Sequence, residues 1–252
     1  MKYLSGANYM TQSPLREAED FARRISNLLN STVASKVNLA VTKLPNGTYW
    51  ISTNLHPTRG DQVTYIPLVH GPYWENAPAL GLKIYYKLDL EPRQKRLSAS
   101  ESSVAISSLI EGRRPIIRWE YERSGGIEPG FPSGKSHARQ AAHVHVHGVS
   151  SEIEHLALNA DLSSHPKLSH KLHKFHIPVG GRRFRPSLED LIEFFLSHGF
   201  VSKFHEGGQE MLEKSRNDWL KQQLKAAVGD DIDTAISTLT EIGYQVQKVS
   251  ES

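Results

Sequence analysis

The residues best suited to chemistry in this sequence are three alternating histidines, His143, His145 and His147, in the segment His-Val-His-Val-His. Because side chains alternate along a strand, the three imidazoles would share one face at a spacing of about 7 Å, with Val144 and Val146 on the other face. Such a row can bind a divalent metal ion, present a histidine nucleophile to a phosphate group, or form a solvated strand face with no catalytic role. The sequence leaves these three interpretations open.

A second segment, 115–123, supplies charged side chains that would suit the histidines. If it forms a strand, Arg118, Glu120 and Glu122 share one of its faces. A carboxylate beside an imidazole fixes the tautomer of the ring and raises its pKa, as a general base or the partner of a metal ligand requires. We therefore predict that Glu120 acts together with the three histidines, provided that the two strands pair. The alternative is that these charges form the wet side of a sheet.

A basic stretch follows the histidine segment. Between residues 161 and 185, six cationic residues accompany a single acid: Lys167, Lys171, Lys174, Arg182, Arg183 and Arg185 against Asp161. A Gly-Gly-Arg-Arg turn just before a predicted helix offers guanidinium groups and a helix N-terminus to an anion. We predict that Arg182, Arg183 and Arg185 contact the phosphate of a nucleotide or nucleic acid.

The segment His-Val-His-Val-His-Gly-Val resembles the motif of the histidine triad family of nucleotide hydrolases and transferases. The resemblance implies that His145 attacks a nucleotide α-phosphate and that His143 and His147 support it. Gly148 departs from the family pattern, which has a larger hydrophobic residue there.

A longer stretch is similar to uncharacterised bacterial proteins, common in actinobacteria, that carry the pattern His-x-Pro-x-Gly-Gly-x-Arg-Phe-Arg-Pro-x-Leu-Glu-Asp. In this chain the pattern covers residues 176–190, and the strand Arg118-Trp119-Glu120-Tyr121 belongs to the same resemblance. That family implies no known activity. An Arg-aromatic-acid strand followed by clustered histidines also resembles TumE-type toxins, which implies a toxin-antitoxin module and a protein partner encoded nearby.

Composition narrows the function classes. The 252 residues include no cysteine, which excludes disulfides, thiolate metal sites and cysteine nucleophiles. Hydrophobic residues make up 38% and charged residues 23%, the balance of a folded protein, and the net charge is only +3. No apolar run is long enough to span a membrane and the first residues lack a signal-peptide core, so we expect a cytoplasmic protein with no membrane partner.

The elements that must position these residues follow from periodicity and turn signals. We predict an α+β protein, forming a single domain over 1–252, with a mostly antiparallel sheet in the first 150 residues and a helical carboxyl-terminal third. A sub-division into 1–160 and 161–252 is the alternative. The predicted helices cover 14–29, 209–228, 231–242 and a segment that begins with a capping box at 187–190. The predicted strands cover 36–44 and 48–52 as a hairpin, then 63–69, 82–90, 115–123 and 142–149.

Three functions are consistent with these patterns. The leading hypothesis is a histidine-dependent phosphoryl or nucleotidyl hydrolase or transferase. A further alternative, ranked after the one that follows, is a metal-dependent hydrolase that uses His143, His145 and His147 to hold a divalent metal ion. The runner-up to the leading hypothesis is a non-catalytic, protein-binding component of a bacterial toxin-antitoxin or defence module, in which the histidine strand is structural.

Overall fold

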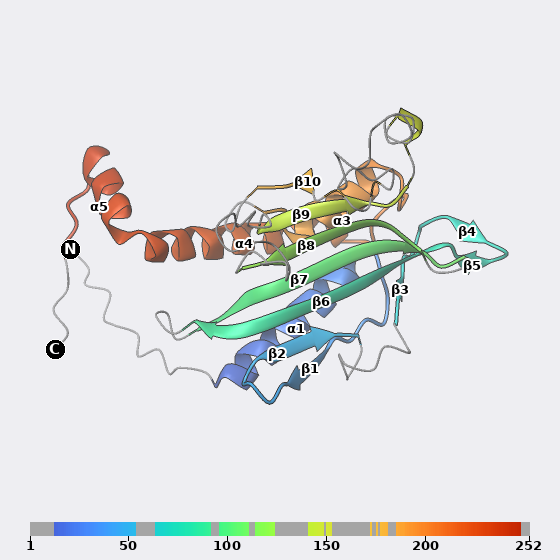
Figure 1. The fold of residues 1–252 in the computed structure, drawn as a ribbon, viewed down its shortest axis with the longest axis horizontal. Helices are drawn as coiled ribbons and strands as arrows, with labels where there is room; N and C mark the ends of the chain where they lie inside the picture. The colour runs from blue at the N-terminus through green and yellow to red at the C-terminus, as the bar shows by residue number, and fades with distance from the viewer. Residues whose placement is uncertain are drawn as a thin grey trace, which may run out of the picture.

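The computed structural model describes residues 13–53, 64–91, 96–110, 114–123, 141–148, 150–152, 172, 175, 177–180 and 185–247. Over these residues one helix precedes an antiparallel sheet, and helices follow the sheet (Figure 1). The predicted α+β class is therefore confirmed, with the sheet reaching residue 178 and helices after it.

The main sheet has the strand order β1-β2-β6-β7-β8-β9-β10. The short strand β3 also pairs with β6, next to the part of β6 that pairs with β2. Within the described residues, all neighbouring strands of this sheet pair in an antiparallel manner, as in a sheet built from hairpins. The strands are β1 (Ala40–Lys43), β2 (Tyr49–Ser52), β3 (Ile66–Pro67), β6 (Leu80–Glu91), β7 (Arg96–Ser108), β8 (Pro115–Glu122), β9 (Ala142–Val146) and β10 (Ile177–Pro178). A separate small hairpin is formed by β4 (Tyr73–Trp74) and β5 (Ala77–Pro78).

The first predicted hairpin is confirmed, since β1 and β2 pair in an antiparallel register. Its turn depends on two residues. Gly47 has φ +85°, a left-handed conformation that glycine adopts without a steric penalty. The side-chain oxygen of Asn46 accepts a hydrogen bond from the backbone N–H of Thr48 at 3.2 Å, which closes the turn.

The helices are α1 (Pro14–Thr32), α3 (Leu188–Ser197), α4 (Gly208–Asp230) and α5 (Ile232–Glu241). Helix α3 begins with the predicted capping box: Ser187 Oγ accepts from the backbone N–H of Asp190, and the Asp190 carboxylate accepts from the backbone N–H of Ser187. Helix α1 begins at the predicted Ser13 cap and continues three residues beyond the predicted end at 29.

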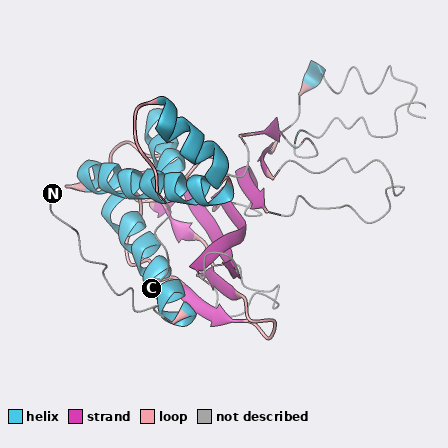
Figure 2. Cartoon of the chain, turned by 90° about the vertical axis from the view of Figure 1, so that its left-hand side faces the viewer, coloured by secondary structure: helices cyan, strands magenta, loops and turns pink. Residues whose placement is uncertain are grey.

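The helices α1, α3 and α4 lie on one side of the sheet, as Figures 1 and 2 together show. The core between the two layers contains fully buried side chains from both, among them Leu28, Ile51, Leu82, Ile106 and Phe195. On β8, Trp119 makes edge contacts with Phe194 and Phe195 of α3, with ring centroids 5.5 and 6.2 Å apart. Because side chains alternate, Arg118 and Glu120 lie on the other face of the sheet.

One long strand was not predicted. Strand β7 lies near the centre of the sheet, between β6 and β8, although six of its thirteen residues are serine. Its helix-side residues Val104 and Ile106 are buried, while most other positions are small and polar. Backbone pairing on both sides compensates for the low strand propensity of this segment, so tertiary context decides its structure.

Helix α5 and the last part of α4 extend away from the sheet (Figure 1). Helix α5 contains no buried residue, and α4 and α5 together expose large apolar side chains: Leu220, Leu224, Val228, Ile232, Ile236 and Leu239. None of the helices that the structure describes combines the length and apolar character needed to cross a membrane.

Candidate functional site

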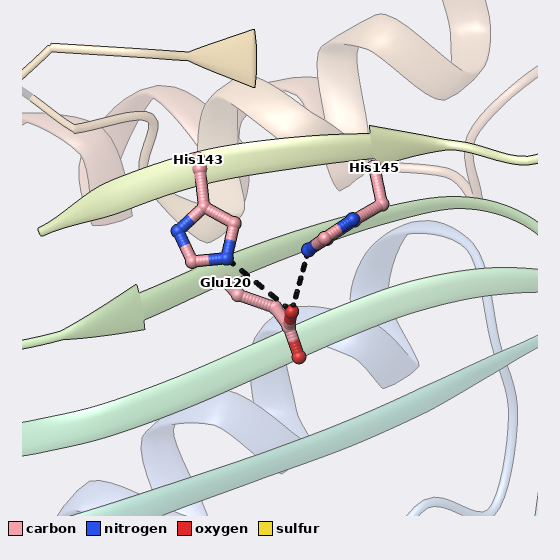
Figure 3. A group of neighbouring side chains, drawn as sticks. All are labelled: Glu120, His143 and His145. Carbon is pink, nitrogen blue, oxygen red and sulfur yellow. Dashed lines mark ion pairs between the residues drawn. The ribbon is translucent and has the colours of Figure 1, made fainter. Parts of the chain in front are cut away.

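The candidate site is created by the pairing of β8 with β9. In this register Glu120 lies opposite His143, and Arg118 lies opposite His145. The two polar faces therefore meet, as expected if the strands pair. This part of the sheet faces away from the helices, so the three side chains point toward one another on the face opposite to the hydrophobic core (Figure 3).

One carboxylate oxygen of Glu120 serves both histidines. Its Oε2 lies 3.0 Å from Nε2 of His145 and 3.5 Å from Nε2 of His143. The two imidazole rings are 5.0 Å apart between centroids and are nearly perpendicular, at 79°. Two residues on the same face of a strand are about 7 Å apart, so the shorter distance between these rings means that they lean toward each other.

The cluster is largely shielded from solvent, and its neighbours keep Glu120 ionised. His143 and His145 are only 4% and 3% exposed, and Glu120 is partly buried. Burial by itself raises the pKa of Glu120, but the hydrogen bond from His143, the positive charge of Arg118 and the electrostatic influence of the two histidines lower that pKa to about 2. The Nε of Arg118 is 3.1 Å from Oε1 of Glu120. Glu120 is consequently an ionised carboxylate at neutral pH.

The third histidine of the predicted row is not part of this group. Within the part of the chain that the structure describes, the His and carboxylate atoms that lie close enough to share one ion belong to Glu120, His143 and His145. His147 follows the end of β9 and is partly buried, and its backbone N–H donates to the carbonyl of Ile116 at 2.8 Å. The predicted set of three histidines thus becomes a set of two histidines and one glutamate.

Of the predicted phosphate-binding arginines, the structure describes only Arg185. Arg182 and Arg183 lie outside the described residues. The guanidinium carbon of Arg185 lies 3.8 Å from the ring centroid of Tyr121, on the helix side of β8. Because Tyr121 and Glu120 point to opposite faces, the sheet separates Arg185 from the histidines.

Two polar residues beside the cluster were missed in the sequence. The strand registers place Ser103 opposite Glu120, and Tyr85 opposite Ser103, on the same face of the sheet. Burial, followed by the charge of Glu120, raises the pKa of Tyr85 to about 12. The alternation of Leu82 and Ile84 with polar residues could have placed Tyr85 on this face, but Ser103 could not be placed without predicting β7.

The geometry suits a metal ion. The three ligand atoms all lie within 4.8 Å of one another. Two donors bound to a tetrahedral zinc ion at about 2.0–2.1 Å are separated by about 3.3 Å. The observed Glu120–His145 and Glu120–His143 separations of 3.0 and 3.5 Å lie on either side of this value. Nitrogen and carboxylate donors are also the ligand types that zinc accepts.

Comparison of the sequence with protein-family models and with curated proteins, and comparison with solved structures, finds no match. The resemblances to the histidine triad family, to the actinobacterial proteins and to TumE-type toxins stay predictions from short motifs. What the chain does must therefore be argued from the cluster of Glu120, His143 and His145 itself.

Proposed function

We propose that Glu120, His143 and His145 bind a divalent metal ion, with zinc as the first candidate, and that the protein is a metal-dependent hydrolase. The observation that carries this proposal is the convergence of one ionised carboxylate on two buried imidazole Nε2 atoms, at 3.0 and 3.5 Å. A divalent ion held by three protein ligands keeps a position for water or substrate and acts there as a Lewis acid.

The same geometry disfavours His145 as a nucleophile toward phosphate. In that hypothesis a ring nitrogen of His145 attacks phosphorus. Its Nε2 instead lies 3.0 Å from the Glu120 carboxylate, whose negative charge would repel an incoming phosphate. A divalent cation bound between the imidazole and the carboxylate would remove this repulsion, because its positive charge attracts the phosphate as well as its two protein ligands. The metal-dependent alternative therefore explains the arrangement better than the leading sequence hypothesis does.

We propose phosphoesters as the substrate class, in keeping with the nucleotide or nucleic-acid ligand expected from the sequence. The supporting feature is Arg118, whose guanidinium lies against Glu120 on the same face of the sheet. A guanidinium beside a metal ion would bind the non-bridging oxygens of a phosphate and hold the ester against the metal. In the described residues this role falls to Arg118 instead of Arg185.

The deciding experiment is elemental analysis of the purified, untagged protein for zinc, manganese, iron and nickel. It is repeated on a His143→Ala/His145→Ala variant and on a matched His70→Ala/His205→Ala variant. His70 and His205 are also neighbouring histidines, with ring centroids 5.2 Å apart, but they lie elsewhere in the fold. We expect stoichiometric metal in the wild type and in the control, and its loss in the first variant. Circular dichroism checks that each variant is folded.

Hydrolysis is then tested with bis(4-nitrophenyl) phosphate, before and after removal and restoration of the metal. Activity that follows the metal content supports the proposal. Stoichiometric metal without hydrolysis of this or other esters would indicate a structural metal site. Absence of metal together with an acid-labile phosphohistidine on His145 would instead favour the nucleotidyl-transfer hypothesis, and absence of both would favour a structural histidine strand.

A further inference from the structure

A cavity lies on the helix side of the sheet, whereas the proposed metal-binding cluster lies on the opposite face. The cavity has a volume of about 590 Å³ and is lined by side chains of α1, α4, the start of α3 and the strands β6, β7 and β8. Cavities of about 300–1,000 Å³ are the usual size for small-molecule sites. This one is therefore large enough to hold a small organic molecule.

The cavity exists because a small residue stands between two large ones on its floor. In the sheet, Ser102 of β7 lies opposite Tyr86 of β6 on one side and opposite Tyr121 of β8 on the other. All three residues line the cavity. The serine leaves a space above the sheet that a larger side chain would fill, so the serine-rich sequence of β7 creates the hollow.

Aromatic rings form much of the wall. Phe21 of α1 packs edge-on against Tyr86, with ring centroids 5.0 Å apart and ring planes at 81°. Two such rings form a corner in which a planar ring can stack on one of them and present its edge to the other. Trp119 and Trp219 also line the cavity. The wall therefore favours a planar aromatic molecule over an aliphatic one.

The ionised side chains of the lining give no preference for an ion. The lining contains equal numbers of acids and bases. The five acids are Glu17, Asp20, Glu91, Glu120 and Glu189, and the five bases are Arg24, Arg96, Arg123, Arg185 and Lys225. Each of the five carboxylates has a partner within the protein. An anion would meet carboxylates as well as cations, and a cation would compete with the partners that the carboxylates already have. Since either ion would also lose its hydration, an uncharged ligand is favoured.

Two lining residues carry a buried polar atom that has no hydrogen-bond partner among the described residues. One atom is the amide oxygen of Gln223 in α4, an acceptor, and the other is the Nε–H of Arg123, a donor just after β8. The remaining nitrogens of Arg123 bind Glu91, Ser98 and the carbonyl of Ala99. A buried polar atom without a partner is unfavourable, so a ligand that supplies the missing partner gains affinity. The terminal torsion of a glutamine is soft, and a small rotation turns its amide toward a ligand.

We propose that this cavity binds an uncharged, planar aromatic molecule that carries both a hydrogen-bond donor and an acceptor, such as an aromatic amide or a nitrogen heterocycle. Its ring would lie in the corner formed by Phe21 and Tyr86. Its donor would bind the amide oxygen of Gln223, and its acceptor would bind the Nε–H of Arg123. This site does not depend on the proposed metal chemistry, because none of these residues belongs to the metal-binding cluster.

The test is titration of the full chain, followed by saturation-transfer NMR, with four uncharged probes: benzamide, nicotinamide, adenine and cytosine. Benzoate and nicotinate match the two amides in shape but carry a charge and no amide donor. Cyclohexanecarboxamide has the amide without the aromatic ring. We expect at least one aromatic amide to bind about tenfold more tightly than its carboxylate, which cannot donate to Gln223. Cyclohexanecarboxamide should bind more weakly than benzamide, because it cannot stack.

The variants Gln223→Met and Gln209→Met form a matched pair on α4. Gln209 is exposed, and its amide donates to Glu213 instead of lining the cavity. Gln223→Met should weaken binding about tenfold, because the donor of the ligand loses its acceptor. Gln209→Met should bind as the wild type does.

The variant Ser102→Met gives a second test that does not depend on the amide. Its larger side chain fills the floor of the cavity, so binding should be lost while the circular dichroism spectrum stays that of the wild type. The proposal is overturned if none of the four uncharged probes binds, if the carboxylates bind as tightly as their amides, or if the two glutamine variants bind equally. Loss of binding on chelation of metal would also overturn it, because the probe would then be bound at the metal-binding cluster.

Discussion

In the paired strands β8 and β9, Glu120 lies directly opposite His143, and its carboxylate reaches diagonally to His145, 3.0 Å away. A directly opposite pair and its diagonal neighbour are within reach of a long side chain on the same sheet face. The cluster therefore needs only two adjacent strands and no loop to hold it. A site built on strands in this way is positioned as precisely as the sheet itself.

Replacement of Glu120 by glutamine should greatly weaken metal binding. The substitution keeps the size of the side chain but removes the charge that makes it a ligand. Loss of a residue that only supports a metal ligand costs about 10–100-fold in affinity, so loss of a ligand should cost at least about 100-fold. Competition with a chelating dye measures the change. Glu122→Gln is the control, since Glu122 lies two residues along the same strand face; equal effects of the two variants would contradict the assignment.

The variant His147→Ala should keep its metal, whereas His145→Ala should lose it. The reason is that His147 lies outside the group of side chains whose ligand atoms are within 4.8 Å of one another. Metal content after dialysis against a weak chelator distinguishes the two variants. If His147→Ala also lost the metal, the three-histidine site expected from the sequence would be the better description.

Much of the site could be predicted because strand alternation is a local property. The order of residues in 115–123 and 142–149 is enough to place Glu120 on one face of its strand and the histidines on one face of theirs, whereas the pairing of the two strands is a finding of the structure. The exclusion of His147 could not be predicted, because it depends on where β9 ends and on how the rings of His143 and His145 tilt toward one carboxylate.

The position of Arg185 shows a different limit of the sequence. The basic stretch that contains Arg185 can be recognised in the sequence. Which face of the sheet Arg185 contacts depends on how the chain enters α3. Its guanidinium stacks on Tyr121, whose side chain points toward the helices. Strand β7 was missed for a related reason: its serines have low strand propensity, and only its two neighbours in the sheet make it a strand.

The two ends of α4 should contribute very differently to stability. Leu212 is fully buried in the core, whereas Leu224, three turns later in the same helix, is 67% exposed. Leu212→Ala should lower the free energy of unfolding by about 2–5 kcal/mol, because it leaves a cavity. Leu224→Ala should change it by no more than about 0.5 kcal/mol. Urea denaturation followed by circular dichroism measures both. A large loss in Leu224→Ala would mean that the exposed end of α4 is buried in solution.

Stability should fall at alkaline pH through Tyr85. Burial and the charge of Glu120 raise the pKa of Tyr85 to about 12 in the folded protein, whereas an unfolded chain has a tyrosine pKa of about 10. Because the unfolded chain releases this proton first, the stabilisation from neutral Tyr85 is complete below pH of about 10 and is lost as the pH rises toward 12. Denaturant unfolding of the wild type and of Tyr85→Phe, compared at pH values between about 9 and 11, should show a shallower loss in the variant. If the stability of the two proteins fell equally with pH, Tyr85 would not be buried beside Glu120. The placement of Tyr85, Ser103 and Glu120 side by side on one face of the sheet would then be wrong.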